Sequence, residues 1–584
     1  MRTNEEDPER LIFTVAEMVA AHPPLESAFV CKMIGQLRGK GPEFALVLNW
    51  IDQQLITIGS SSTGMFNIEN PKQSADQVSI SNSISSLRAL AVNDWREFVE
   101  RHSIVEHILR GDGHGTYALM DFNTRDRYRH VVEYISKRSG SGEWEVASLA
   151  VRLAQDAKAA GGSRERQSHV GYFLVGKGVR QTQTLAGAPA SLLVKPPGSS
   201  GMILALYLGT ILLITAAGST VALLNSYAAG VRNTWLIVAL VLLIILCLSQ
   251  LAISVVNFFV TQFVKPLPLP RMDFSKAIPF EAKSLVVIPA MLRTVEAIDG
   301  LVDGLEVRYL ANRDKNLHFG LLTDFEDSLL EHQPMDDELV SHARARILKL
   351  NEKYGRGDND LFYLFHRPRR CNPREERWMG YERKRGKFCD LNALLREDRI
   401  DQFSVIVGEQ TVFASIKYVI TLDADTPLPL NAAWKLIGTM AHPLNRPLLD
   451  MLRKKVVEGY GVLQPRVTLS IPDASSSRYR RMYSTQTGID PNTRASSDVY
   501  QDLFAERSFI GKGIYDVDIF QVLNGRFLEN RILSHDLLEG CYVRPALVSD
   551  VQLFEQYPGT YRSDMKTRMR WVRGDWQILA WSLP

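Results

Sequence analysis

The sequence has few cysteines and no arrangement of them that would bind a metal. The chain contains five cysteines, an odd number, and no CxxC pair. They are widely spaced, at Cys31, Cys247, Cys371, Cys389 and Cys541. This pattern excludes a disulfide-stapled miniprotein and a cysteine-based zinc site, and it fits a reducing compartment.

The sequence also lacks an excess of charge. Its 584 residues include 68 Lys and Arg against 65 Asp and Glu, a formal net charge of +3. This balance gives no overall argument for binding nucleic acid, and the short aromatic and basic run Phe362–Arg370 does not change it. We therefore predict no nucleic-acid partner. The 45% hydrophobic and 23% charged residues are typical of a globular protein of several domains.

Charge is absent altogether from two long stretches. Pro196–Val231 and Asn233–Val264 contain no Asp, Glu, Lys or Arg. Within them, Met202–Leu224 and Trp235–Val260 are apolar and long enough to reach across a hydrocarbon core of about 30 Å. Helices buried in a large soluble core are the alternative, but such helices rarely run this long without a polar face. We predict a transmembrane hairpin in a lipid bilayer.

The cations around this hairpin predict its orientation, since cationic residues near helix ends resist translocation. The connecting loop has one, Arg232, whereas the outer flanks have five: Arg180, Lys195, Lys265, Arg271 and Lys276. Both large flanks are therefore predicted to be cytoplasmic. The charged residues 2–11 do not form a signal peptide.

Residues 1–180 are predicted to be a helical cytoplasmic region. Apolar residues recur there at helical spacing over 11–21, 42–58, 84–110 and 129–137. Residues 181–264 then form a linker and the two membrane helices, at about 202–224 and 235–260. A proline-rich exit, Lys265–Arg271, leads into a third region, residues 265–584.

In this third region, short apolar runs of strand length alternate with helical patterns. The predicted strands are 285–289, 317–323, 361–365 and 417–422, and the predicted helices are 293–312, 336–354 and 387–395. This alternation predicts an α/β domain with a mainly parallel sheet flanked by helices. In such sheets, ligands gather beyond the carboxyl ends of the strands.

Two aspartates, Asp423 and Asp425, directly follow the last of these strands. Burying two carboxylates so close together is costly without a cation, whereas Mg²⁺ or Mn²⁺ can join them to a diphosphate. An exposed pair with no function is the alternative. A haloacid dehalogenase phosphatase also places two aspartates after a strand, but Pro427 occupies the place where its DxDx[TV] motif needs Thr or Val.

Further candidates lie toward the end of the chain. Asp536 either caps a helix, as Ser534 also could, or acts as a general base. In Arg568–Gln577, guanidinium groups suit a diphosphate and a tryptophan face suits a sugar, although the segment could also be an interfacial anchor. Gly511–Gly513 lacks the P-loop spacing and is interpreted as a close backbone approach to a ligand.

The order of DxD, a base aspartate and an RW pair resembles processive, inverting membrane glycosyltransferases of GT-A fold, with Thr567 where their QxxRW motif has Gln. Nine segments resemble, more closely, the glycosyltransferase module of bacterial cyclic β-1,2-glucan synthases. They are SNSISSLRAL (81–90), YALMDFNTRDRYR (117–129), HVGYFLVGKG (169–178), TLDADTPLP (421–429), GYGVLQPRV (459–467), SDVYQDLF (497–504), GKGIYDV (511–517), LSHDLLEG (533–540) and RWVRGDWQ (570–577).

This resemblance implies transfer of glucose from UDP-glucose to the 2-hydroxyl of a growing glucan, with inversion. Asp425 would coordinate Mg²⁺ or Mn²⁺, and Asp423 would help to hold the metal and the nucleotide sugar. Asp536 would be the base, and Arg570 and Trp571 would line the diphosphate and the acceptor.

Two more residues are candidates for the nucleotide. Asp324, at the end of the second predicted strand, would contact uridine. Lys387 would contact the diphosphate, although the basic run Arg383–Lys387 is also typical of a solvated face. No Ser/His/Asp or Cys/His constellation is present, and inverting transfer needs none because it forms no covalent enzyme intermediate.

The resemblance also implies a multi-pass protein of the bacterial inner membrane whose partners are UDP-glucose, a glucan acceptor and the lipid bilayer. Related synthases are longer, with additional C-terminal membrane helices and carbohydrate-active domains, so we expect this chain to be truncated. Two alternatives remain: a membrane synthase of another β-glucan or polysaccharide, and a catalytically silent scaffold that binds nucleotide sugars.

Overall fold

The computed structural model describes two compact units, Met1–His102 and Ser103–Pro584. Within them, the described residues are 8–160, 166–189, 201–264, 266, 268–355, 360–470, 477–483, 498–523, 525–527, 529–531 and 536–582. The linker 161–167 and the flanking Lys195 and Lys265 therefore lie wholly or partly outside the described residues.

The first unit is entirely helical in its described part. Its elements are α1 (Pro8–Ala20), α2 (Ser27–Leu37), η1 (Pro42–Phe44), α3 (Ala45–Thr57), α4 (Ser62–Val92) and α5 (Trp95–His102). A small core of apolar side chains from α2 and α3 holds it together: Val30, Ile34, Leu37, Val47, Ile51 and Leu55. The helices predicted at 11–21 and 42–58 are confirmed.

The single helix predicted over 84–110 is wrong, because the structure divides this range among α4, α5 and α6 (Ile104–Arg110). Two side chains cap the new helix starts. Asp94 Oδ1 accepts a hydrogen bond from the backbone N–H of Arg96 at 2.9 Å, and Ser103 Oγ accepts one from Glu106 at 3.2 Å. Such caps satisfy backbone donors that a continuous helix would have paired, so each cap favours a new start.

The second unit begins with further helices that pack against the sheet. They are α6, η2 (Tyr117–Leu119), α7 (Phe122–Ser139), α8 (Glu143–Ala159), α9 (Gly171–Leu174) and α10 (Val179–Leu185). Leu109, Val132 and Ala150 from these helices belong to the same buried cluster as Val286 and Ile420 from the strands. The predicted helical region 1–180 thus contributes to both units, and its second half shares the core of the sheet.

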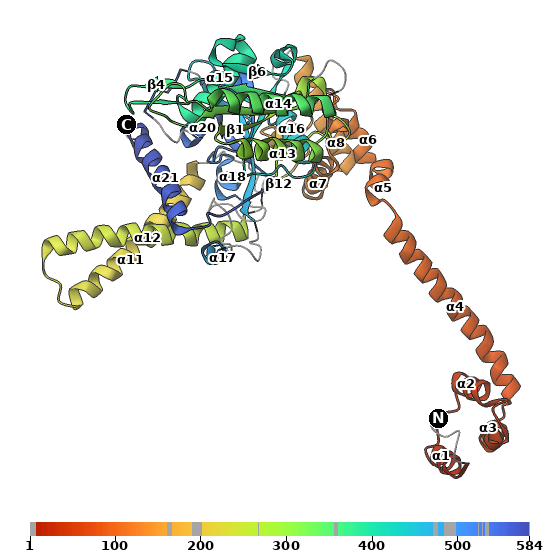
Figure 1. The fold of residues 1–584 in the computed structure, drawn as a ribbon. Coiled ribbons are helices and arrows are strands. Elements are labelled where there is room, and N and C mark those ends of the chain that lie inside the picture. Colours follow the sequence, from red (N-terminus) through yellow and green to blue (C-terminus); the bar gives the residue numbers. More distant parts are fainter. Residues whose placement is uncertain are drawn as a thin grey trace. The chain divides into compact units, whose positions relative to one another are not determined.

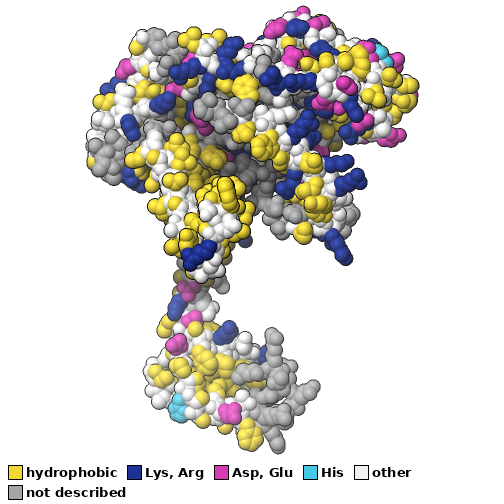
Figure 2. All heavy atoms as spheres, turned by 90° about the vertical axis from the view of Figure 1, so that its left-hand side faces the viewer, with side chains coloured by type: hydrophobic (Ala, Val, Ile, Leu, Met, Phe, Trp, Pro, Cys, Tyr) yellow, Lys and Arg dark blue, Asp and Glu magenta, His cyan; other side chains and the backbone are white. Residues whose placement is uncertain are grey.

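Two long helices form the predicted hairpin. The most apolar stretch of α11 (Gly201–Ala228) has a mean hydropathy of 2.0, and that of α12 (Thr234–Phe263) has a mean hydropathy of 3.0. Only 11% of the first stretch and 6% of the second is buried. Figure 1 shows them side by side, and Figure 2 shows hydrophobic side chains over the projecting hairpin. Helices of a soluble core would be mostly buried, so the exposure of α11 and α12 fits a membrane hairpin better than the soluble-core alternative.

The centre of the second unit is an eight-stranded sheet in the order β12-β10-β11-β7-β1-β2-β3-β6. Its strands are β1 (Ser284–Leu292), β2 (Leu317–Phe325), β3 (Phe362–His366), β6 (Val405–Val407), β7 (Tyr418–Thr421), β10 (Val462–Leu469), β11 (Gly513–Asp516) and β12 (Pro545–Glu555). The four predicted strands are confirmed as the parallel neighbours β7, β1, β2 and β3, whereas β6 and β11 run antiparallel to their neighbours. The sheet is therefore mixed but mostly parallel.

Helices cover both faces of this sheet. The larger ones are α13 (Val295–Ala311), α14 (Asp336–Tyr354), α15 (Arg383–Glu397) and α16 (Ala432–Ala441). The last helix, α21 (Tyr561–Ser582), is mostly exposed. Val286 of β1 lies in the buried cluster that includes Leu305 of α13, whereas the adjacent Val287 lies in the cluster that includes Leu391 of α15. Successive strand residues thus face opposite helical layers, as the period of two in a strand requires.

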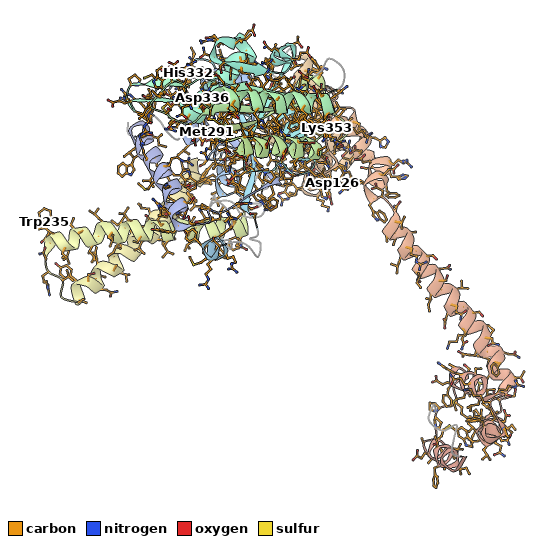
Figure 3. All side chains as sticks on the ribbon, viewed as in Figure 1. Asp126, Trp235, Met291, His332, Asp336 and Lys353 are labelled. Carbon is orange, nitrogen blue, oxygen red and sulfur yellow. The ribbon has the colours of Figure 1, made fainter. Side chains whose placement is uncertain are left out.

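The remaining elements are short. The short helices are η4 (Phe280–Ala282), η5 (Ile400–Gln402), η6 (Gln410–Ser415), α17 (Arg478–Tyr483), α18 (Val499–Phe504), α19 (Val517–Gln521) and α20 (Asp536–Val543). Two further sheets have two strands each. One pairs β4 (Arg370–Asn372) with β5 (Arg377–Met379), and the other pairs β8 (Leu448–Asp450) with β9 (Lys455–Glu458). In Figure 3, Met291, near the end of β1, lies on the same side of the unit as Asp336, the first residue of α14. Lys353 lies at the other end of α14.

Candidate active site at the carboxyl edge of the sheet

The parallel strands bring the predicted aspartates to one edge of the sheet. Met291 of β1 pairs with Asp324 of β2, and Val287 of β1 pairs with Thr421 of β7, two residues before Asp423. His366, at the end of β3, pairs with Thr323 of β2. The carboxyl ends of all four strands therefore lie together, where ligand sites form in sheets of this kind.

The turn that contains Asp423 and Asp425 is held through its backbone by Arg308 of α13. This buried guanidinium donates to the carbonyl oxygens of Asp423 at 3.4 Å, Ala424 at 2.8 Å and Thr426 at 2.7 Å. No feature of the sequence pointed to Arg308, which lies inside a predicted helix. Its contacts hold the peptide groups in place and leave both carboxylates free to face outward.

The carboxylate of Asp423 lies between two ammonium groups. Lys384 Nζ of α15 is 3.1 Å from its Oδ1, and Lys512 Nζ is 2.9 Å from its Oδ2. Burial tends to raise the pKa of Asp423, but the two lysines outweigh it and lower that pKa below its ordinary value. Lys512 also pairs with Glu555 of β12, so it links the DxD turn to the far part of the sheet.

Asp425, two residues on, has a different environment. It is exposed, and the described residues offer its carboxylate no salt bridge or hydrogen bond. No group of three or more His, Cys, Asp or Glu in the described part of the chain could hold a metal ion. One or two carboxylates completed by substrate phosphates and water are, however, a usual Mg²⁺ arrangement, and Asp425 with Asp423 fits that arrangement.

Asp536, at the start of α20, lies beside the same lysine. A Cβ atom at Gly511 would come within 2.8 Å of the Asp536 carboxylate carbon and oxygens, so this carboxylate packs directly on the glycine. The Gly511 carbonyl accepts a hydrogen bond from Lys384 Nζ at 2.9 Å. Burial tends to lower the pKa of Lys384, but Asp423 and Asp536 outweigh it and raise that pKa. The residues 532–535, with the predicted cap Ser534, lie outside the described residues.

Gly511 is one position where only glycine fits this arrangement. Its φ of +81° lies in the left-handed region that L side chains rarely adopt, and a side chain would displace Asp536. The predicted close backbone approach at Gly511–Gly513 is thus observed toward Asp536.

Asp324 is placed at the same edge but is fully buried. Its Oδ1 is 2.9 Å from Arg367 Nε, and its Oδ2 is 3.1 Å from Arg367 Nη2 and 3.2 Å from Lys387 Nζ. Arg367 also contacts Asp390 at 2.7 Å. Because the Asp324 carboxylate is buried as well as paired at both oxygens, this network resembles a structural ion cluster more than an open ligand site.

Lys387 belongs to this network and does not lie on a solvated face. Its Nζ is buried and donates to the Ala290 carbonyl of β1 at 2.5 Å. Burial lowers the pKa of Lys387. Arg367 and Arg369, from the run considered for nucleic acid, are buried as well, and Arg369 pairs with Asp336 at 3.2 Å.

Arg570 and Trp571 lie on α21, where both are exposed, and neither lines the cavity beside Asp536. The helix contacts the domain farther along, where the rings of Trp581 and Phe527 are 6.1 Å apart and Ile578 packs on a buried cluster. The roles assigned to Arg570 and Trp571 therefore stay predictions.

The cavity beside Asp536 measures about 370 Å³. Its wall includes Lys384, Thr421 and Gly511 together with aromatic rings from several elements: Tyr381, Phe388, Phe509, Tyr515, Phe520 and Phe527. A half-buried carboxylate beside aromatic surface can accept a proton from a hydroxyl held against those rings.

Comparison with known proteins confirms the predicted resemblance. No family model matches the chain. It is 37% identical over 587 aligned residues to the cyclic beta-(1,2)-glucan synthase NdvB of Rhizobium meliloti (strain 1021). That alignment covers 100% of this chain and 20% of that protein. Along its whole length, this chain is thus similar to one fifth of a cyclic β-(1,2)-glucan synthase.

Proposed function

We propose that this chain is a membrane-bound inverting glycosyltransferase of GT-A fold that transfers glucose from UDP-glucose to a growing β-1,2-glucan. The similarity to NdvB supports the reaction class and the glucan. The UDP-glucose donor, the inverting mechanism and the metal are parts of the proposal that rest on the motifs and on the geometry of the site.

The observation that carries the proposal is the meeting of Asp423 and Asp536 at Lys384. These aspartates are separated by more than a hundred residues, yet Lys384 contacts Asp423 at 3.1 Å and the carbonyl of Gly511, on which Asp536 packs, at 2.9 Å. A donor-binding carboxylate and a base must belong to one site for a hydroxyl to attack a bound sugar.

In this scheme, Asp536 removes the proton from the attacking 2-hydroxyl as the new bond forms. Asp425, with Asp423, would hold Mg²⁺ or Mn²⁺, which when bound supplies positive charge to the departing diphosphate. Lys384 and Lys512 keep Asp423 ionised and fix its orientation. Arg308 prevents the turn from shifting when charge moves across the site.

The membrane hairpin would place this reaction at the inner face of a bacterial inner membrane, with both flanks cytoplasmic. A nucleoside diphosphate sugar is charged and cannot cross a bilayer unaided, so the donor and the catalytic domain must lie on the same side of the membrane. Arg570 and Trp571, on the exposed helix α21, are proposed to meet the diphosphate and the acceptor. The contacts predicted for Asp324 with the uridine and for Lys387 with the diphosphate are not part of this proposal, because the two side chains are buried and paired with each other.

The experiment is UDP release from UDP-glucose in membranes that contain the chain, with and without Mg²⁺ or Mn²⁺. Asp536→Ala and Asp425→Ala are each expected to abolish release, and Asp337→Ala, at an exposed carboxylate on α14, is the matched control. Undiminished release in both variants would refute the assignment.

Analysis of the product then separates the remaining alternatives. A β-1,2 linkage supports the proposal, whereas another linkage would assign the chain to a different polysaccharide synthase. Binding of UDP-glucose without UDP release in the unmodified chain would indicate a nucleotide-sugar-binding scaffold.

A further inference from the structure

A second pocket lies away from Asp536, between the helices that follow residue 103 and the strand region. It measures about 150 Å³, and four cationic side chains line it against one acidic side chain. The cations are Arg127, Arg166, Lys177 and Arg544, and the acid is Glu458. Its other walls are largely apolar or aromatic, and they include Tyr172, Pro268, Tyr460 and Ala505.

The protein balances the charges in this pocket only in part, with the two carboxylates of Glu458 and Glu506 near four cations. Arg166 and Lys177 share the single carboxylate of Glu458, with Arg166 Nη1 at 3.1 Å. Arg127 donates to the carbonyl of Pro268, and the described residues give it no carboxylate partner. Arg544 donates to the carbonyls of Val457 at 3.1 Å and Ala505 at 3.2 Å, and its Nε lies 3.4 Å from the carboxylate of Glu506, which is outside the pocket lining. Burial lowers the pKa of both Arg127 and Arg166, so an anion in the pocket would relieve a cost that the fold now bears.

The pocket also borders the hairpin. Pro268 comes five residues after Phe263, the last residue of α12, and five extended residues span at most roughly 18 Å. Ala505 directly follows Phe504, whose ring lies 5.9 Å from the ring of Tyr207 near the start of α11. Pro268 and Ala505 therefore connect the pocket to the end of the hairpin that adjoins the rest of the unit.

We propose that this pocket binds the phosphate headgroup of an anionic membrane lipid. The four cations supply the charge, and the apolar walls beside the hairpin suit the start of the acyl chains. Basic pockets beside membrane helices are suited to anionic headgroups, and each Lys or Arg adds favourable attraction. The assignment does not depend on the proposed transferase reaction, because none of these residues lines the cavity at Asp536.

The test uses the full chain in an uncharged detergent and measures lipid binding by native mass spectrometry. Phosphatidylglycerol, phosphatidylcholine and inorganic phosphate are the probes. The unmodified chain should bind phosphatidylglycerol at least tenfold more tightly than phosphatidylcholine, and Arg127→Gln with Lys177→Gln should weaken it about thirtyfold. The matched control removes two exposed cations elsewhere, by Arg152→Gln with Arg344→Gln, and should leave binding unchanged.

Equal loss in the control variant, or equal binding of the two lipids, would overturn the proposal. Displacement of the lipid by inorganic phosphate at comparable concentration would assign the pocket to free phosphate and overturn the lipid assignment. If the double variant does not fold, Lys177→Gln alone serves, since this side chain is 64% exposed, and about fivefold weaker binding is then expected.

Discussion

Two groups of acidic and basic side chains occupy the same edge of the sheet, yet they differ in exposure. Asp324 is 2% exposed, and both of its oxygens are held by Arg367 and Lys387. Asp423 is 40% exposed, with two lysines at its oxygens, and Asp425, two residues on, is exposed and makes no described salt bridge or hydrogen bond. The first group is closed, whereas the second can still accept a ligand.

The difference in exposure predicts that the buried group affects mainly stability and the exposed group mainly catalysis. Removing one partner from a buried ion pair leaves an uncompensated charge in a low-dielectric interior, which is strongly destabilising. Replacing an exposed carboxylate changes the free energy of unfolding little, so the replacement mainly affects ligand binding and activity. The residue type and the position at a strand end are the same in both groups, and only the surroundings differ.

The largest expected effect falls on activity alone. Asp425→Asn should reduce UDP release about 10²- to 10⁴-fold, the range for loss of one essential group, because the amide cannot supply the metal with a negative ligand. The melting temperature should change little, since this carboxylate is exposed and interacts with the buried Arg308 only through its charge, without a described salt bridge or hydrogen bond. A large fall in melting temperature would show that Asp425 belongs with the structural group.

Asp324→Asn is the converse change. It should cost about 3–5 kcal/mol of stability, because Arg367 and Lys387 would remain buried with less negative charge to compensate them. Thermal unfolding of the full chain in detergent measures the effect, and Asp337→Asn on exposed α14 is the control. Retained stability with lost UDP-glucose binding would instead place Asp324 in the nucleotide site.

Buried histidines at the two ends of the sheet should make stability sensitive to acid. Burial lowers the pKa of His318, at the start of β2, and of His366, at the end of β3, each to about 4. Between pH 6.5 and about 4, the unfolded chain binds protons that the folded chain does not, so stability falls as pH falls. At pH 5, the lowered pKa of His318 alone should reduce the free energy of unfolding by roughly 2 kcal/mol.

His318→Gln should therefore lose less stability than the unmodified chain when the pH is lowered from 7.5 to 5. His332→Gln, at a side chain that is 84% exposed, should behave like the unmodified chain. Melting temperatures at the two pH values measure both. An unchanged pH dependence in His318→Gln would contradict the assignment.

The smallest expected effect concerns the position of Asp536. Gly511→Ala should reduce UDP release about tenfold, because the new Cβ would meet the Asp536 carboxylate at 2.8 Å and displace it. Gly115→Ala is the matched control, since its φ of +73° carries the same backbone strain and nothing lies within 4 Å. Both variants should lose about 1 kcal/mol of stability, and only Gly511→Ala should lose activity.

The membrane hairpin and the parallel centre of the sheet could be predicted from the sequence because both depend on local patterns. Uncharged stretches long enough to cross a bilayer correspond to α11 and α12, and four apolar runs correspond to β1, β2, β3 and β7. The strands β10, β11 and β12 were not predicted, since their pairing depends on partners far away in the chain. The breaks after α4 and α5 were missed because single capping side chains decide them.

For the candidate site, the sequence alone identified Asp423, Asp425, Asp536 and Asp324 through their places after apolar runs and within motifs. Only the tertiary structure decided which of these carboxylates are buried and which cations meet them. Lys384 of α15 and Arg308 of α13 reach the DxD turn through packing of helices on the sheet, and Lys512, just before β11, reaches it through pairing of β11 with β7. Charge pairing of this kind acts over a few ångströms, so it follows from the spatial arrangement of elements and leaves no fixed spacing in the sequence.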